Sequence, residues 1–391
     1  METWRRTWAE IDIDCLRFNY NKIRKCVSDA SEICCVVKAN GYGHNALRVA
    51  RELSALGALW FAVSNIEEAL QLRYGGIDAS VLILGYTPVS CATLLAENDI
   101  SQCVYSYEYA AALARENQSS KKIKIHIKSD TGMGRIGFST VNTEDAVASI
   151  DEICAICKLG GLDPEGIFTH FAISDGGESG RNYTESQYRR FMNLIDALDK
   201  EGVHFKYKHC SNSAAVFEYP EYQMDMVRAG IVLYGLLPSD EVKAPELRPV
   251  MSLKSVVSFV KDVKKGTPLS YGCEYVAPED MRVATVPIGY ADGFFRTNFS
   301  GGGKVVVNGV QADIVGRVCM DQMMIDVSGI ENVSMGDEVL LFGREGITAD
   351  TLAKVNGTIN YEIICAVGER VPRVFKKDGE VVDIVDAVFK V

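Results

Sequence analysis

Between residues 30 and 235, short apolar runs of strand type alternate with segments in which apolar residues recur at helical spacing. The predicted strands cover 33–38, 58–64, 80–86, 102–106, 122–128, 166–172, 205–210 and 224–228. Helical patterns between them include 45–56, 65–74, 107–115 and 187–200. Eight strand–helix units in about 200 residues match the count and length of a (β/α)8 barrel. A doubly wound open sheet is the alternative that this pattern leaves open.

After Pro238 the pattern changes to strand-like runs separated by glycine-rich turns, and only 348–355 predicts a short helix. We therefore expect a second, mostly-β domain. The alternating stretch "TWAEIDID" near the N-terminus is expected to pair with it as a strand. The predicted organisation is α/β: an N-terminal strand in 1–10, a TIM-type barrel in 11–240 and a C-terminal mostly-β domain in 241–391.

Composition narrows the possible partners and the compartment. The net charge of -11 disfavours binding to nucleic acid or to an anionic membrane surface. The N-terminal stretch has no apolar core of a secretory signal, and no run is long enough to span a membrane, so a cytoplasmic location is expected. Twelve scattered cysteines are too few for a disulfide scaffold in 391 residues. Cys154 and Cys157 form a C-x-x-C without a second ligand pair, which favours a structural role, and we expect no metal site.

The stretch "VVKANGYGH" ends an apolar run on Lys38 and continues directly into turn-forming residues. A buried ammonium is costly, whereas the end of a strand is where a rigid scaffold presents reactive groups. A reactive lysine is therefore one interpretation of this position. The alternative is a lysine whose long side chain simply reaches solvent.

Further polar groups follow the predicted strand ends. They are Lys128, His170, His209 and Arg228. Because the carboxyl ends of barrel strands meet at one rim, these side chains and Lys38 are expected to face a common site.

The ends of the seventh and eighth strands are where barrels commonly bind phosphate. Here Ser213 offers a hydroxyl, Gly230 and Ile231 offer backbone N–H groups, and Tyr42 offers a third kind of donor. A phosphate on one side of the barrel mouth and a lysine on the other suggest a phosphorylated carbonyl cofactor held as a Schiff base. Pyridoxal 5'-phosphate has both features.

The chain resembles the alanine racemases, pyridoxal-phosphate enzymes of fold type III. The resemblance rests on motifs that occur in the family's order from 36 to 375: "VVKANGYGH", "KSDTGMGRIGF", "HCSNSAA", "VRAGIVLYG", "LSYGCEYVA", "PIGYADGF", "GRVCMDQMMIDV", "INYEI" and "RVPRVF". It implies a barrel plus a β domain, assembled as a head-to-tail homodimer with shared active sites. The reaction it implies is the interconversion of L-alanine and D-alanine, which supplies D-alanine for cell-wall peptidoglycan.

The resemblance also assigns roles to residues. It implies that Lys38 binds the cofactor and acts as one catalytic base, and that Tyr271 from the partner's β domain is the opposite base. Arg135 would hold the substrate carboxylate, and Met320 and Asp321 would complete the substrate pocket.

Other positions match contacts to the cofactor or support for the site. Tyr42, Ser213, Gly230, Ile231 and Tyr361 match phosphate contacts, Arg228 faces the pyridine nitrogen, and His170 and His209 lie beside and behind the ring. Lys128 matches a lysine that is often carbamylated in the family, and a carbamate there would fix Arg135.

Two positions depart from the family pattern. The family often has R-P-G where this chain has Arg228-Ala229-Gly230, and a tyrosine or a similar residue where Gly368-Glu369 precede "RVPR". Alanine at 229 removes a constraint on φ but keeps the Gly230 amide. Neither change touches a reacting group, so we expect them to affect only fine geometry.

The implied chemistry explains the residue types. Racemisation removes a proton from one face of Cα and adds one to the other, which two bases on opposite faces can do. The pKa of a tyrosine is ordinarily about 10, and a guanidinium such as that of Arg135 would lower it. Desolvation would lower the pKa of the lysine.

Three other functions remain to be weighed against alanine racemisation. A serine racemase of the same fold would differ in the substrate pocket. A non-catalytic pyridoxal-phosphate carrier resembles the barrel alone, and residues 240–391 argue against it. Basic amino-acid decarboxylases share the architecture, but they carry a cysteine-bearing motif that we do not find at the position of Tyr271.

Overall fold

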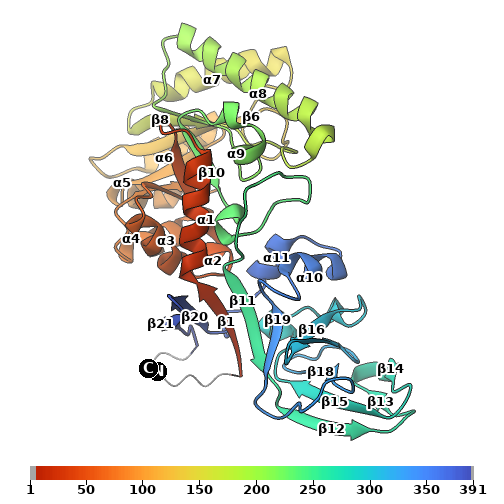
Figure 1. Ribbon diagram of the computed structural model, residues 1–391. Coiled ribbons are helices and arrows are strands. Elements are labelled where there is room, and N and C mark those ends of the chain that lie inside the picture. Colours follow the sequence, from red (N-terminus) through yellow and green to blue (C-terminus); the bar gives the residue numbers. More distant parts are fainter. Residues whose placement is uncertain (1–5, 389–391) are drawn as a thin grey trace. The chain divides into compact units, whose positions relative to one another are not determined.

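The computed structural model describes residues 6–388 and divides into two compact units (Figure 1). The described part of one unit consists of residues 6–16, 42–45 and 248–388. The other unit consists of residues 17–41 and 46–247. The chain thus passes between the units near its N-terminus, again on both sides of the loop that follows Lys38, and finally near residue 247.

The larger unit is built around eight parallel strands. In the order in which they pair they are β10 (Met226–Ala229), β2 (Glu32–Val36), β3 (Trp60–Val63), β4 (Ser80–Ile83), β5 (Ile100–Val104), β6 (Ile123–Asp130), β8 (Leu162–Phe168) and β9 (Tyr207–His209). Backbone hydrogen bonds from Asp225 to Lys208 and from Arg228 to Ser211 join the two ends of the row. The prediction of a (β/α)8 barrel is therefore confirmed, and the open-sheet alternative is wrong.

Helices connect consecutive strands and cover the barrel (Figure 1). They are α1 (Ile13–Cys26), α3 (Ala46–Ala55), α4 (Ile66–Tyr74), α5 (Ala92–Glu97), α6 (Tyr107–Glu116), α7 (Thr143–Cys157), α8 (Gly177–Lys200) and α9 (Ala215–Glu218), with short 3-10 turns at Val89–Cys91, Pro220–Tyr222 and Ile231–Tyr234. Each of α4, α6 and α7 begins at an Asn or Ser whose side chain accepts a hydrogen bond from the first turn.

The observed strands lie close to the predicted ranges, with one clear displacement. The sixth strand was predicted at 166–172, whereas β8 covers Leu162–Phe168. Its first half contains Pro164 and polar residues, and its register with β6 shifts between Ile125 and His126. The apolar residues that indicated this strand therefore begin only in the second half of β8 and continue beyond its end, which displaced the predicted range toward the C-terminus.

The smaller unit is mostly β. Its main sheet has the order β17 (Val310–Asp313), β16 (Lys304–Val307), β19 (Glu338–Phe342), β11 (Met251–Val256), β1 (Thr7–Asp12), β20 (Arg373–Lys377) and β21 (Glu380–Val385). A three-stranded sheet joins β12 (Phe259–Val263), β15 (Met281–Val286) and β18 (Met323–Asp326), and β13 (Pro268–Leu269) pairs with β14 (Tyr275–Val276). The N-terminal strand β1 pairs with β11 and with β20.

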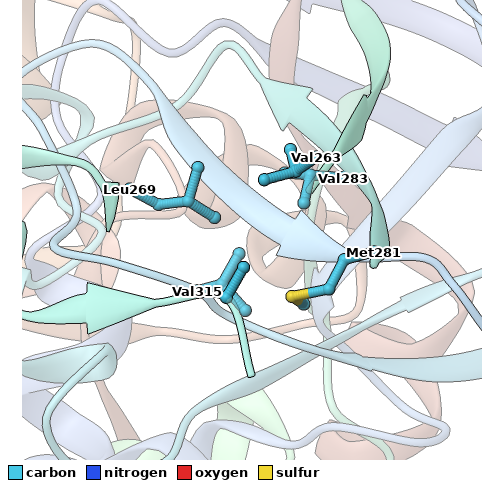
Figure 2. Packing of buried hydrophobic residues seen from close by; sticks show 6 residues of the cluster. Val263, Leu269, Met281, Val283 and Val315 are labelled. Atoms are coloured by element: carbon cyan, nitrogen blue, oxygen red, sulfur yellow. The ribbon is translucent and has the colours of Figure 1, made fainter. Parts of the chain in front are cut away.

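Two short helices complete this unit, α10 (Ala349–Asn356) and α11 (Asn360–Cys365). The sequence pattern predicted only the first. Figure 2 shows a small core of the unit in which Val263, Leu269, Met281, Val283 and Val315 pack against one another. Because Leu269 in this core directly precedes Ser270-Tyr271, the packing anchors the loop that carries Tyr271.

Candidate active site

Lys38 lies two residues beyond the end of β2, at the start of a turn with an unusual backbone. Ala39, Asn40, Gly41 and Tyr42 all have φ between 51° and 65°, so this segment (α2, Lys38–Tyr42) is a left-handed turn. Residues other than glycine adopt this conformation at a cost of about 1–2 kcal/mol each. Such strain persists only where surrounding contacts impose it, and it is found preferentially at functional sites.

Contacts within the barrel unit hold this turn. The backbone N–H of Ala39 donates to Oε1 of Glu68 at 2.6 Å, and Gly41 donates to the carbonyl of Val37 at 2.8 Å. The side-chain oxygen of Asn40 accepts from the backbone N–H of Ala46 at 3.0 Å, at the start of α3. Lys38 is therefore presented from a fixed backbone rather than from a loose loop.

The barrel's cations gather around His170. Burial holds the pKa of His170 well below its usual value, and the charges of Arg228, Arg135, Lys128 and Lys38 lower it further, in that order. Side chains that act together on one imidazole must lie near one another. The structure thus brings together the residues predicted from four different strand ends, and their charge favours an anionic ligand.

Lys128 is the most deeply buried lysine of this group, with a relative exposure of 2%. Its Nζ donates to the carbonyl of Ser129 at 2.6 Å and lies 5.8 Å from the centre of the Phe168 ring. Burial lowers its pKa to about 8, and the charges of Arg228 and Arg135 act in the same direction. About a tenth of the Lys128 side chains are therefore uncharged at pH 7, far more than for an ordinary lysine.

Arg228 is equally enclosed, at 3% exposure. Its guanidinium donates to the carbonyls of Thr169 and Cys210 at 2.8 and 2.9 Å, and to Nδ1 of His209 at 2.7 Å. Burial lowers its pKa to about 10. Within residues 6–388, every acceptor bonded to this guanidinium is neutral, so its plane is fixed without a direct ion pair.

Two hydrogen-bond donors follow the ends of β9 and β10. The buried Ser213 hydroxyl accepts from the backbone N–H of Gly230 at 2.9 Å, which leaves its own hydrogen to donate. Ile231 begins a 3-10 turn, so its N–H has no partner inside that turn. A hydroxyl and a backbone N–H at a helical start suit a phosphate, so the donors present here fit the phosphate of pyridoxal phosphate.

Tyr42 and Tyr361 lie together in the smaller unit, with ring centres 6.1 Å apart. Burial raises the pKa of Tyr42 far above its ordinary value, and the neighbouring Tyr361 adds to this. Tyr42 therefore keeps its proton and can act as a hydrogen-bond donor. Tyr361 is carried by α11, the helix that the sequence pattern did not predict.

Tyr271, Met320 and Asp321 line one pocket of about 520 Å³ in the smaller unit, together with Ser270, Cys319, Gln322 and Met324. Tyr271 is 68% exposed and Met320 is 53% exposed. The loop before Tyr271 is fixed because Ser270 donates to the carbonyl of Arg317 at 2.6 Å. Large apolar side chains so exposed around an open pocket are typical of a surface that another surface covers.

The wall formed by residues 319–321 has a support that the sequence did not reveal. Backbone N–H groups of Tyr290 and Ala291 donate to the carbonyls of Cys319 and Met320, at 3.1 Å each. Arg370 joins Asp321 at 2.6 Å to the fully buried Asp292 at 2.8 Å. Arg370 lies 49 residues from Asp321 in the sequence, so the local spacing of residues could not indicate that Arg370 holds the Asp321 carboxylate in place.

The C-x-x-C pair lies on α7, where both thiols are half-buried and unpaired. Burial raises the pKa of Cys154, and raises that of Cys157 to about 11. A reactive thiol needs the opposite shift. Neither thiol has the lowered pKa of a reactive pair, and a structural role for the pair stays a prediction.

Comparison with known proteins identifies the family. The model of the alanine racemase N-terminal domain matches residues 11–238, and that of the alanine racemase C-terminal domain matches residues 250–375. The chain belongs to the alanine racemase family. The resemblance seen in its motifs is therefore confirmed, and the protein is an amino-acid racemase.

Named alanine racemases match over nearly the full length. One from Clostridium perfringens is 46% identical over 386 residues, covering 97% of this chain and 98% of that relative. One from Desulforamulus reducens is 45% identical over 371 residues, covering 94% and 98%.

Solved alanine racemase structures share the whole architecture. The enzyme of Clostridium difficile 630 superposes with a TM-score of 0.94 at 42% identity, covering 99% of this chain and 100% of that one. The Bacillus anthracis enzyme, solved with bound L-Ala-P, gives 0.90 at 38% identity, covering 99% of each chain. Within residues 6–388, none of the helices is both long and apolar enough to serve as a membrane span.

Proposed function

We propose that this chain is a pyridoxal-phosphate-dependent alanine racemase that uses Lys38 and Tyr271 as two bases. The observation that carries the proposal is the convergence of Lys38, Lys128, Arg135 and Arg228 around His170. This cationic site adjoins a hydroxyl and backbone N–H set suited to phosphate. When bound, the cofactor would withdraw electrons from the amino acid and make its Cα–H acidic.

Each residue of the barrel has a task that follows from its environment. Lys38 would bind the cofactor and afterwards take or return a proton at Nζ on one face of Cα. The Ser213 hydroxyl and the Ile231 N–H would hold the phosphate, together with Tyr42 and Tyr361, and the Gly230 N–H would orient the Ser213 hydroxyl. Arg228 stays charged even with its lowered pKa, so it would donate a hydrogen bond to a neutral pyridine nitrogen. His170 and His209 would lie beside and behind the ring.

Two groups of residues would orient the substrate: cations of the barrel unit, and residues 320–321 of the smaller unit. Arg135 would bind the amino-acid carboxylate. The lowered pKa of Lys128 makes its uncharged form more accessible for reaction with carbon dioxide, and the resulting carbamate anion would fix Arg135. Met320 and Asp321 would form the wall of the substrate pocket, kept in place by Arg370.

Tyr271 would act at its phenolic oxygen as the base on the opposite face. Its exposure within one chain supports an arrangement in which it serves the site of a second copy, so we propose a homodimer with shared sites.

The division of the chain into 1–10, 11–240 and 241–391 remains our working definition of its domains.

We also propose a place for the reaction. The chain would act in the cytoplasm, which suits cysteines that form no disulfide within residues 6–388, and would supply D-alanine for peptidoglycan. Alanine is the expected substrate, with weaker activity on serine, since a pocket sized for a methyl rejects a slightly larger side chain only about 10–200-fold.

The experiment is a racemisation assay combined with chemical trapping. Purified protein with pyridoxal phosphate should interconvert the enantiomers of alanine faster than those of serine. Borohydride reduction should fix the cofactor on the peptide that contains Lys38. Lys38→Ala should abolish both results, and Lys38→Arg, which keeps a cation but cannot form the imine, should do the same. Trapping on another lysine would overturn the assignment.

A further inference from the structure

Two hydrogen bonds join three buried side chains through the interior of the barrel, beginning at Arg228, and a carboxylate lies close to the last of them. Nη1 of Arg228 lies 2.7 Å from Nδ1 of His209, and Nε2 of His209 lies 2.9 Å from Nδ1 of His126. Nε2 of His126 lies 3.3 Å from Oε1 of Glu165. We call these residues the Arg228–Glu165 network. It crosses β10, β9, β6 and β8, and Glu165 is its most exposed member, with 13% of its side chain exposed.

The chemistry of the two ends fixes the protons between them. A guanidinium only donates hydrogen bonds, and an ionised carboxylate only accepts them. Nδ1 of His209 therefore accepts from Arg228, which leaves the proton of a neutral imidazole on Nε2. That N–H donates to Nδ1 of His126, whose own proton then lies on Nε2 and points to Glu165. Both hydrogen bonds run in one direction, away from the cation, and the Nε2–H of His126 then meets the carboxylate in an electrostatic contact at 3.3 Å.

Both imidazoles are neutral, as this arrangement requires. Burial holds the pKa of His209 well below its usual value, with a further contribution from the charge of Arg228. Burial also lowers the pKa of His126, although Glu165 acts in the opposite direction. Burial raises the pKa of Glu165, but the neighbouring His126 and the hydrogen bond from Ser101 outweigh this and leave it lowered. The network thus has a cation at one end and an anion at the other.

The two rings cannot readily turn away from these bonds. A Cβ on Gly166 would overlap Nδ1 of His126, so glycine at this position lets the ring lie flat against the backbone of β8. Trp60 and Tyr207 pack on the other sides of His126. Phe168 stacks on His209 with ring centres 4.9 Å apart and planes at 8°.

We propose that Glu165 and His126 are positioning residues for Arg228. Their role is to hold His209 in the tautomer that accepts from the guanidinium, and so to fix the plane that Arg228 presents to the site. The idea rests on the proposed function, in which Arg228 faces the pyridine nitrogen. Without the carboxylate, His126 could carry its proton on Nδ1, His209 would follow, and an N–H of His209 would then point at a donor of Arg228.

Three variants separate position from stability. Glu165→Leu removes the acceptor, whereas Glu165→Gln keeps an acceptor oxygen but loses the charge. Glu52→Leu is the matched control, because Glu52 has a similar side-chain exposure of 11% and pairs with Arg48 at 3.0 Å, outside the network. A general loss of stability would alter the measurements for both Glu165→Leu and Glu52→Leu. A change in the position of Arg228 would alter them for Glu165→Leu only.

The first measurement is the nitrogen NMR spectrum of histidine-labelled full-length protein, with and without pyridoxal phosphate. The chain has five histidines, so assignment by single replacement is feasible. We expect Nε2–H tautomers at His126 and His209 in the wild type, in Glu165→Gln and in Glu52→Leu, and a changed tautomer at His209 in Glu165→Leu. A wild-type His209 protonated on Nδ1, or no change in Glu165→Leu, would overturn the proposal. Should Glu165→Leu not fold, Glu165→Ala takes its place in the same comparison.

The second measurement is made on the loaded enzyme. Glu165→Leu should shift the visible absorption maximum of the cofactor and lower kcat about 10- to 100-fold, as expected for a displaced positioning contact, with a smaller change in KM. Glu165→Gln should have an absorption maximum and a kcat close to those of the wild type, and Glu52→Leu should match the wild type in both. An active wild type with an unaltered Glu165→Leu would refute the network and leave the proposed function standing. Correct tautomers in a protein that does not racemise alanine would refute the function instead.

Discussion

At the level of single residues, burial decides what Lys128 can do. Its pKa of about 8 lies below the ordinary value of 10.5 because the barrel interior disfavours the charged amine. Between these two values the unfolded chain binds more protons than the folded one. The free energy of unfolding therefore gains a contribution from Lys128 as the pH rises from about 8 to 10.5, and this contribution is absent below pH 8.

This gives a measurable difference between wild type and Lys128→Met. In buffer free of carbon dioxide, the free energy of unfolding of the wild type relative to the variant should rise by about 1–3 kcal/mol from pH 8 to pH 10.5. Denaturant titration at several pH values measures it. Added bicarbonate should flatten the dependence if a carbamate forms. A constant difference across the window in carbon dioxide-free buffer would show that the folded pKa is not lowered.

Sequence motifs identified the residues at strand ends better than those that support them. Lys38, His170 and Arg228 follow apolar runs, so their position at the barrel rim could be predicted from the pattern. Asp292 and Glu165 could not be assigned in this way. Asp292 binds Arg370, 78 residues away, and Glu165 binds His126 from another strand. Such pairs depend on the register of the folded sheet, which local spacing does not contain.

At the level of elements, the turn after β2 is where the backbone carries strain. The sequence pattern extended the strand to Lys38, whereas β2 ends at Val36 and the chain then enters a left-handed turn. Ala39 and Asn40 ordinarily avoid this conformation, so composition alone could not predict it. The contacts from Glu68 and Ala46 that impose it exist only in the folded barrel.

Two glycines test how strongly this turn matters. Gly41 has φ 65°, and a Cβ there would lie 3.1 Å from backbone atoms of Ala46, whereas Gly57 has φ 91° with open space around it. Gly57→Ala should cost about 1 kcal/mol of stability. Gly41→Ala should cost at least about 1 kcal/mol more and should also lower racemisation, because Lys38 is displaced. Thermal unfolding and the racemase assay measure both effects, and equal behaviour of the two variants would contradict the role of the turn.

At the level of the whole molecule, the two compact units contain different sets of the residues to which we assign the chemistry. The barrel unit contains Lys38 and the cations around His170, and the smaller unit contains the open pocket with Tyr271 and Met320. The change of pattern after Pro238 indicated the second unit in the sequence. The apolar pattern could not predict assembly into a dimer. It indicates which residues are buried, but it does not indicate whether the same chain or a second copy buries them.

Mixing inactive chains tests the shared site. Lys38→Ala and Tyr271→Phe chains should each be inactive or nearly so. In a random mixture half of the dimers are hybrids with one complete site, so about a quarter of the wild-type activity should return. Subunit exchange is first verified with chains of different tag length. No recovery after verified exchange would mean that each chain builds its own site.

The central claim is that two bases act on opposite faces of Cα, and hydrogen exchange in heavy water tests it most directly. The wild type should introduce deuterium at Cα of both enantiomers of alanine. Tyr271→Phe should lose about 10²- to 10⁴-fold in racemisation, yet Lys38 should still exchange the Cα hydrogen of one enantiomer with retention of configuration. Tyr74→Phe, at another exposed tyrosine, should behave as the wild type. Equal exchange of both enantiomers by Tyr271→Phe, or its undiminished racemisation, would contradict the two-base account.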